Sequence, residues 1–272
     1  MKHILLLLCV LLAACGEKKS DAWLGYGEGD SAFISAPQPG WVVRMNVQRG
    51  QMVRRGDLLF TLDDTREQAG RDQAVATLAQ AKASLEQEQS NLVFMRTELA
   101  RQNGLARANA GTPAQRDQAQ TNYQQSAARV SQLRAQIAQM QASLTNAAYG
   151  LSQRVVTAQT EGPVQDIYFR EGEYVPASTP VVSILPPANV FVRFFVPESQ
   201  LSQVHLGRKM KITCDGCKPL DATISFIAAQ EEFTPPVIFS VGNREKLVFK
   251  LEARAPGGLK INPGQPVEVR PQ

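Results

Sequence analysis

The sequence predicts an elongated, modular protein of mixed class, in which a long antiparallel helical hairpin splits a small β-sandwich and a second β-module follows. Three observations predict this fold. The segment Ser35–Leu62 aligns without a gap to Thr157–Ile184, 122 positions later, and both segments alternate like strands. The chain between them has the composition of two long helices. Strand-like alternation then returns toward the C-terminus.

The first segment is a leader rather than structure. Lys2 precedes an apolar run over residues 4–12, which is too short to span a bilayer as a mature helix. The run ends in Leu-Ala-Ala-Cys, which resembles a lipobox, and polar residues follow. We therefore expect residues 1–14 to be a lipoprotein signal peptide and Cys15 to be lipidated. An ordinary secretory signal cut near Cys15 is the alternative.

Lipidation implies a location. Each buried methylene of an acyl chain contributes about 0.8 kcal/mol, so several chains anchor a protein firmly. We expect a periplasmic protein tethered to a membrane by Cys15. The inner membrane is favoured, although Gly16 is not the aspartate that retains lipoproteins there. Residues 15–34 are expected to form the tether and, near Trp23–Phe33, a weakly patterned strand.

The repeat defines two β-halves, residues 35–64 and 154–186. Glycines recur at equivalent places in both halves. Between the glycines, apolar residues alternate with other residues, as in short strands joined by glycine turns. The matched pairs include Ala36 with Ala158, Gly40 with Gly162, Val42 with Val164, Gly50 with Gly172, and Val53 with Val175. One duplicated unit is therefore interrupted by the insertion.

Residues 65–153 are predicted to form the helical hairpin. Neither Arg71–Asn103 nor Ala114–Tyr149 contains Gly or Pro, and each is rich in good helix formers, so each helix is at least ~50 Å long. Between them the segment Gly104–Pro113 contains two glycines and a proline and is expected to turn. Thr112 before Pro113 is a typical N-cap for the second helix.

Apolar residues along both helices follow alternating steps of three and four, which is the seam of a coiled coil. The expected seam comprises Leu78, Ala81, Leu85, Leu92, Met95 and Leu99 on the first helix and Val130, Leu133, Ile137, Met140, Leu144, Ala147 and Leu151 on the second. The stripe is narrow and the remaining surface polar, so a single hairpin is marginal alone. We therefore expect side-by-side packing with copies or a partner; a solvated spacer is the alternative.

Residues 187–272 are predicted to form the second β-module. Alternation is clear around Val190–Val196, Met210–Ile212, Leu247–Leu251 and Val267–Val269. A short helix is expected from Pro197 to Val204, stopping before Gly207.

These features together resemble HlyD-type membrane fusion proteins, the periplasmic adaptor subunits of tripartite exporters, and in particular their lipoprotein members. The split repeat resembles the two halves of their lipoyl-like domain, and the hairpin resembles their coiled coil. The C-terminal module resembles their β-barrel in the segments Val190-Phe191-Val192, Val196-Pro197-Glu198 and Pro263-Gly264-Gln265-Pro266-Val267. The resemblance implies a split lipoyl-like β-sandwich with an inserted α-hairpin, plus a small β-barrel.

The resemblance also implies a docking site. Adaptors of TolC-like outer-membrane channels carry an Arg, a Leu four residues later and a Ser seven residues after that, at the hairpin tip. This chain has Arg101, Leu105 and Thr112 at those spacings, with a Thr hydroxyl in place of Ser. Arg101 can donate several hydrogen bonds to channel groups, and Leu105 can fill an apolar notch. A solvated helix arginine is the other interpretation of Arg101.

The family further implies the partners. Six copies are expected to form a ring that joins an inner-membrane transporter to a TolC-like channel, with the lipid as membrane anchor. The segment Glu232–Pro236, together with Leu247–Phe249, resembles adaptors of ABC-type exporters. The alternative is a structural envelope lipoprotein with a coiled-coil spacer and no transport role.

Cys214 and Cys217 flank Asp215-Gly216, a strong signal for a two-residue hairpin turn. Cysteines facing each other across such a turn lie about 5.5 Å apart at Cα, within disulfide range. A local disulfide is expected in the periplasm. A redox pair would open a helix, and a zinc site needs about four ligands, so both are disfavoured and no metal or cofactor is expected.

Other function classes fit poorly. The 29 basic and 25 acidic residues are nearly balanced, which argues against nucleic-acid binding. The chain has two histidines, one of them in the leader, and no Gly-x-Ser-x-Gly elbow, so we expect no enzyme and no catalytic residue. A carrier with a lipoyl or biotinyl arm needs a Lys at the turn joining the halves, where this chain has Asp63-Asp64.

Overall fold

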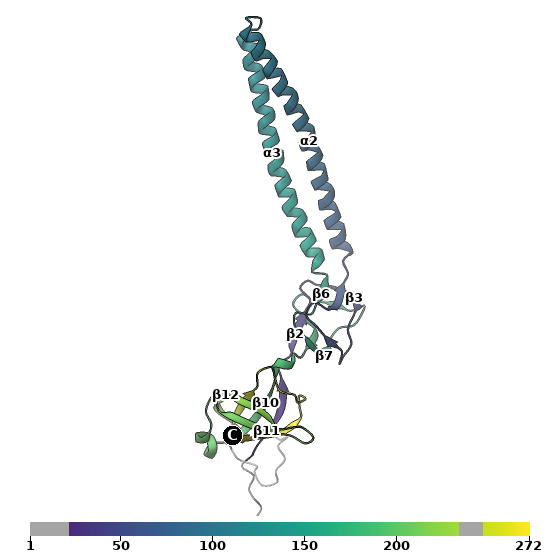
Figure 1. Cartoon of the computed structure of the whole chain (residues 1–272). Coiled ribbons are helices and arrows are strands. Elements are labelled where there is room, and N and C mark those ends of the chain that lie inside the picture. Colours follow the sequence, from purple (N-terminus) through teal and green to yellow (C-terminus); the bar gives the residue numbers. More distant parts are fainter. Residues whose placement is uncertain (1–21, 234–246) are drawn as a thin grey trace, which may run out of the picture.

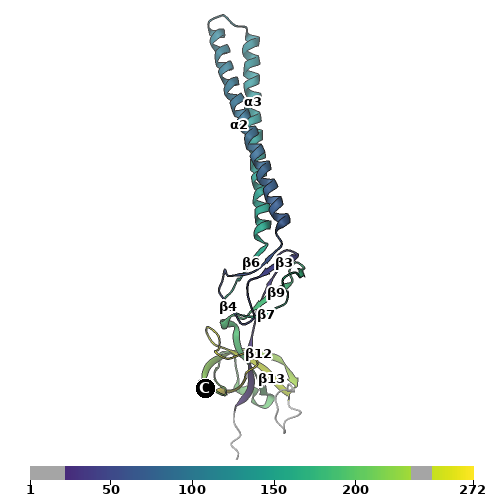
Figure 2. The same cartoon turned by 90° about the vertical axis from the view of Figure 1, so that its right-hand side faces the viewer.

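A computed structural model describes residues 22–233 and 247–272. The expected signal peptide and Cys15 lie outside the described residues, as does part of the Glu232–Pro236 segment. The molecule is elongated, with a helical hairpin at one end, a small β-sandwich in the middle and a β-barrel at the other end (Figure 1). A view turned by 90° shows the same succession (Figure 2).

The β-sandwich consists of two four-stranded sheets. The first has the order β2-β9-β7-β4, with bounds Ala32–Ser35, Pro180–Ile184, Gly162–Ile167 and Met52–Val53. The second has the order β6-β5-β3-β8, with bounds Val155–Thr157, Leu58–Leu62, Gly40–Met45 and Tyr174–Val175. Each sheet therefore takes strands from both halves of the repeat.

The repeat is confirmed at the level of single residues. A shift of 122 residues relates β3 to β7, β4 to β8 and β5 to β9. The equivalent strands also stand in the same order in the two sheets. Matched valines such as Val42 and Val164 are both 1% exposed in the shared core. The halves are thus interleaved, so neither can bury its apolar face without the other.

The insertion folds as two long helices, α2 (Thr65–Arg107) and α3 (Pro113–Ser152). At 1.5 Å per residue each is about 60 Å long. The chain turns within the expected segment Gly104–Pro113; α2 continues to Arg107, so the turn itself occupies residues 108–112. An internal glycine costs only about 1 kcal/mol, and α2 runs through both Gly70 and Gly104.

The predicted seam is confirmed. Its members are buried or half-buried, whereas most other hairpin side chains are exposed. A polar pair interrupts it, because Ser126 on α3 donates a hydrogen bond to Glu88 Oε1 on α2 at 2.6 Å. Asn91 donates to the same oxygen at 3.0 Å. A polar contact within an apolar seam fixes the register of two helices, because a shifted register leaves it unpaired.

This pair makes the hairpin sensitive to pH. The hydrogen bonds from Ser126 and then Asn91 lower the pKa of Glu88 below its ordinary value of 4.5. A carboxyl group whose pKa is lowered by folding stabilises the fold above its unfolded pKa and loses this contribution as the pH falls through the folded value. We expect acid below about pH 4.5 to destabilise the hairpin, and Glu88→Gln to flatten this dependence. Thermal melts followed by circular dichroism across pH 3–7 test this; an unchanged slope in the variant contradicts it.

The barrel is closed, with strand order β1-β10-β13-β12-β11-β14. These strands span Trp23–Gly29, Val190–Pro197, Leu247–Arg254, Leu220–Phe233, Lys209–Thr213 and Pro266–Pro271 in that order. The sequence patterns did not predict β12. Two short 3-10 helices flank β10: η2 (Pro187–Asn189) precedes it, and η3 (Glu198–Gln203) follows it in place of the expected helix from Pro197 to Val204.

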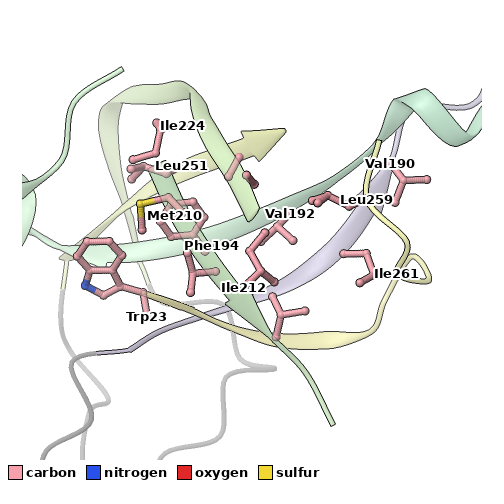
Figure 3. Close-up of a cluster of buried hydrophobic side chains, with 14 of the residues drawn as sticks. Trp23, Val190, Val192, Phe194, Met210, Ile212, Ile224, Leu251, Leu259 and Ile261 are labelled. Atoms are coloured by element: carbon pink, nitrogen blue, oxygen red, sulfur yellow. The ribbon is translucent and has the colours of Figure 1, made fainter. Parts of the chain in front are cut away.

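The N-terminal strand completes the barrel. β1 pairs antiparallel with both β10 and β14. The strand that was expected near Trp23 is therefore present. Trp23 is 5% exposed and stacks on Phe194 with ring centroids 5.9 Å apart, inside the barrel core (Figure 3). The strand ends at Gly29, however, and Phe33 lies in β2 of the sandwich. The N-terminal segment therefore links the barrel directly to the sandwich. Within the described ranges, no helix is long and apolar enough to cross a membrane.

Candidate docking site at the hairpin tip

The turn between the helices is short and fully specified by backbone hydrogen bonds. Ala110 N donates to Leu105 O at 2.9 Å and Asn109 N to Ala106 O at 3.1 Å. Asn109 adopts a left-handed φ of 53°. This is the Schellman motif, in which a left-handed residue after a helix satisfies its last carbonyl groups. The last carbonyl groups of α2 are therefore satisfied within the turn.

Thr112 begins α3 as predicted, with Pro113 at the first helical position. Its hydroxyl oxygen accepts from Gln115 N at 3.3 Å, and the Gln115 side chain accepts from Thr112 N at 3.1 Å. This reciprocal pair is a capping box. The Thr112 hydroxyl still has its own proton, so it can donate one hydrogen bond outward while it caps the helix.

The structure brings Leu105 and Thr112 together. A methyl group added to Gly111 would lie 3.2 Å from Leu105 Cβ, so the Leu105 side chain lies against the turn just before Thr112. Leu105 nevertheless remains 39% exposed. Arg101 lies one helical turn below Leu105 on the same side of α2. The three predicted residues thus lie at one end of the hairpin.

A local network holds Arg101. It forms an ion pair with Glu98 on the preceding turn, and its side chain is 66% exposed. Gln102 Nε2 donates to Glu98 Oε1 at 2.8 Å. The Gln102 hydrogen bond and, after it, the Arg101 charge lower the pKa of Glu98 against the opposing effect of burial. Glu98 is therefore ionised at neutral pH, and it orients a guanidinium group that still presents donors to solvent.

Sequence reasoning missed several tip residues. Gln115 could have been found, because Thr112 followed by Gln three positions later is the capping-box signature. Glu98, three residues before Arg101, is at the spacing of helical ion pairs. Gly111 and Asn109 carried only a general turn signal, since their roles depend on how the Leu105 side chain packs and on the backbone angle at the helix end.

At the other end of the hairpin, Arg154 connects it to the sandwich. Its guanidinium group pairs with Glu67 on α2 and donates to Pro39 O at 2.8 Å. Its own carbonyl accepts from Leu62 N at 2.8 Å. The Arg154 and Glu67 side chains are only 10% and 17% exposed. We call Arg154, Glu67, Pro39 and Leu62 the hairpin root. Through Arg154, which follows α3, they connect the base of the hairpin to the sandwich at β5 and at the residue before β3.

The cysteine pair lies in the β11–β12 loop. Cys214 and Cys217 are joined as a disulfide with Cα atoms 5.4 Å apart. Cys217 N donates to Cys214 O at 3.2 Å, and Gly216 has a φ of 76°, which closes a β-turn. The expected two-residue hairpin was wrong, because the last ladder pair is Ile212 with Leu220. The turn therefore lies inside a longer loop.

In residues 22–233 and 247–272, no group of three or more His, Cys, Asp or Glu residues could hold a metal ion. His205 is exposed, and one of its ring nitrogens lies 3.0 Å from Leu206 O.

The chain is similar in sequence to known proteins over part of their length. It is 30% identical over 251 residues to the multidrug resistance protein MdtA of Proteus mirabilis, a match covering 89% of this chain and 55% of MdtA. It is 31% identical over 140 residues to a UPF0194 membrane protein of Acidithiobacillus ferridurans, covering 48% of this chain and 41% of that protein. The chain thus spans about half the length of these relatives. No protein-family model matches it.

The fold is shared with solved structures. MacA of Actinobacillus actinomycetemcomitans superposes with a TM-score of 0.74 at 17% identity, over 92% of this chain and 77% of MacA. The membrane fusion protein Spr0693 of Streptococcus pneumoniae superposes with a TM-score of 0.59 at 18% identity, over 92% of this chain and 98% of Spr0693. The hairpin, the interleaved sandwich and the barrel therefore form the fold that solved membrane fusion proteins such as Spr0693 have. The resemblance inferred from the sequence is confirmed.

Proposed function

We propose that this chain is a non-catalytic periplasmic adaptor, which links an inner-membrane transporter to a TolC-like outer-membrane channel for efflux or secretion. The observation that carries the proposal is the hairpin tip. A short, hydrogen-bonded turn joins two helices about 60 Å long, and Arg101, Leu105 and Thr112 lie together at this end. An exposed guanidinium group, an exposed leucine and a hydroxyl group suit docking onto the polar helix ends of a channel.

The arrangement of the modules supports the same function. The tip and the barrel lie at opposite ends of the molecule (Figure 1). We propose that the barrel end contacts the transporter and that six copies form the working ring. An ABC-type transporter is favoured by the segment Glu232–Pro236, which lies partly outside the described residues. In this arrangement the protein catalyses no reaction; it seals a passage between two membrane proteins.

The N-terminal anchor is part of the proposal. We propose that Cys15 is acylated, holds the protein at the inner membrane and leaves residues 22 onward in the periplasm. There the Cys214–Cys217 disulfide is a local crosslink within the β11–β12 loop, because an oxidising compartment preserves it.

Metabolic labelling with a palmitate analogue is expected to mark the wild-type chain and not Cys15→Ser. Equal labelling of both contradicts acylation at Cys15. Mass shifts on alkylation with and without reductant report the disulfide.

Capture from living cells tests the function. The full chain, crosslinked in its native host and purified, is expected to recover one inner-membrane transporter and one outer-membrane channel. An ATP-binding transporter supports the ABC assignment, whereas a proton-driven one contradicts that assignment alone. Recovery of neither partner contradicts the adaptor function and favours an envelope lipoprotein with a coiled-coil spacer.

A further inference from the structure

The sandwich and the barrel are joined by a neck of two chain segments (Figure 1). One consists of residues 30–31, between β1 and β2, and the other of residues 185–189, between β9 and β10. Modules that are joined by short segments move relative to one another unless contacts between them prevent it. The stiffness of the neck therefore depends on what its two segments contact.

Leu185 in the neck is built into both modules. Its backbone N donates to Pro163 O in β7 of the sandwich at 3.0 Å. Its side chain is 4% exposed and belongs to the core of the barrel, whereas the preceding Ile184 belongs to the core of the sandwich. A Cβ on Gly29, at the end of β1, would lie 2.6 Å from Leu185 Cδ1. The two cores therefore meet at adjacent residues of one chain segment.

The two neck segments also bind each other. Asp30 N donates to Asn189 O at 3.2 Å, and Asn189 Nδ2 donates back to Asp30 O at 2.9 Å. On the barrel side, a Cβ on Gly258 would lie 1.8 Å from Pro187 O, so the loop after β13 packs backbone against backbone on η2. The neck is thus held between the modules and not only by its own chain.

A row of alternating charges continues from the neck onto the barrel. Asp30 Oδ2 accepts from Arg254 Nη2 at 2.8 Å, and the same Arg254 nitrogen lies 3.4 Å from Glu252 Oε2. Glu252 Oε1 accepts from Arg193 Nη2 at 2.9 Å, and Arg193 Nη1 lies 2.7 Å from Glu28 Oε2. We call these five residues the neck clasp. They connect β1, β10 and β13 to the neck, and each inner member has two partners of opposite charge.

A buried aromatic ring orients the arginine that reaches the neck. Arg254 Cζ lies 4.0 Å from the centroid of the Phe191 ring, and Phe191 on β10 is only 1% exposed. A guanidinium group is flat and is attracted to the face of an aromatic ring, which an ammonium group cannot cover in the same way. Arg254 is therefore supported by the barrel through Phe191 while it donates to Asp30 in the neck.

We propose that the neck clasp fixes the orientation of the barrel on the sandwich, with Arg254 as the positioning residue. Asp30 is the clasp member that belongs to the neck, so the Arg254–Asp30 contact is the side-chain link between the barrel and the joint. With the clasp closed, the barrel and the sandwich move as one body. In an adaptor, a displacement of the barrel is then passed on to the sandwich instead of being absorbed at the neck.

Pulsed electron spin resonance, which measures the distribution of distances between two spin labels, tests the clasp in the purified full chain. Spin-labelled unnatural amino acids at Arg55 of the sandwich and Lys218 of the barrel, both exposed, span the neck. A second pair, at Ser202 and Lys218, lies within the barrel module. We expect a narrow distribution for each pair in the wild-type background. Arg254→Ala is expected to broaden the distribution across the neck at least about twofold and to leave that within the barrel unchanged.

Further variants identify the contact. Arg254→Lys keeps the charge but loses the flat surface on Phe191, so an intermediate width is expected. Asp30→Ala is expected to broaden the distribution as much as Arg254→Ala, and the double variant no further, because both remove one contact. The matched control Arg270→Ala removes an exposed barrel arginine that pairs with Glu268 on its own strand. This control is expected to leave both distributions unchanged.

Three outcomes overturn the clasp. The first is a wild-type distribution across the neck as broad as that of Arg254→Ala, and the second is a variant distribution as narrow as that of the wild type. The third is equal broadening of the pair within the barrel, because Arg254 would then hold the barrel together and not the joint. None of these measurements involves a membrane partner, so they decide the clasp independently of the adaptor function.

Discussion

A chain with Arg101→Asp is expected to keep its fold and its transporter and to lose the outer-membrane channel. The exposed guanidinium group is the one charged donor among the three tip residues. Charge-assisted hydrogen bonds contribute about 1.5–3 kcal/mol each, so their removal lowers channel affinity more than about tenfold per tip. The new carboxylate would also stand three residues from Glu98, where like charges repel. Recovery of the channel by crosslinking, together with export in cells, is the measurement.

The matched control is Arg107→Asp. Arg107 is also exposed and lies in the last turn of α2. It is six residues after Arg101 and therefore on a different side of the helix. Arg107→Asp makes the same change of charge close to the tip but leaves Arg101 in place. This variant is therefore expected to leave channel recovery near the wild-type level. Equal losses in both variants would show that general charge matters and not the Arg101 site. Normal recovery with Arg101→Asp would remove the docking assignment, while transporter capture would still bear on the adaptor function.

Arg154→Ala is expected to loosen the hairpin root. The variant leaves Glu67 largely buried without its cation and leaves Pro39 O without its donor. Breaking a buried pair by removing one partner costs about 3–5 kcal/mol, and we expect about 3 kcal/mol because Glu67 keeps some contact with water. Amide hydrogen exchange of residues 65–72 and 148–154 is the direct measurement, and protection there should fall while the barrel keeps its own.

The double variant Arg154→Met with Glu67→Leu is the control for this loss. Replacing both charges by apolar groups of similar size is often neutral, because no uncompensated charge remains. Arg154 Nε has no hydrogen-bond partner among the described residues, so the native pair is itself only partly satisfied. We expect the double variant to recover most of the protection. Unchanged exchange in Arg154→Ala would show that the helices hold the root without the ion pair.

The sequence alone determined the features that depend on neighbouring residues. The 122-residue repeat, the coiled-coil seam and the cap at Thr112 all follow from spacing and local propensity, and the structure has each of them. The exact end of α2 was not predicted, because Gly104 is a weak signal inside a helix. The helix continues to Arg107 and ends in the Schellman turn at Asn109.

The matched glycines show where sequence reasoning ended. Gly40 and Gly162 hold equivalent places, and the repeat predicted turns for both. A Cβ on Gly40 would lie 2.7 Å from the Arg154 guanidinium group, and one on Gly162 would lie 2.3 Å from Leu185 O. Each glycine makes room for a different neighbour. That neighbour is known only when the chain has folded.

Tertiary structure alone decided which strands share a sheet, where Trp23 lies and which residues meet at the hairpin root. Arg154 and Pro39 are 115 positions apart, so no local pattern links them. Local interactions fix helices, turns and repeats, whereas contacts between distant residues depend on how apolar surfaces are buried together.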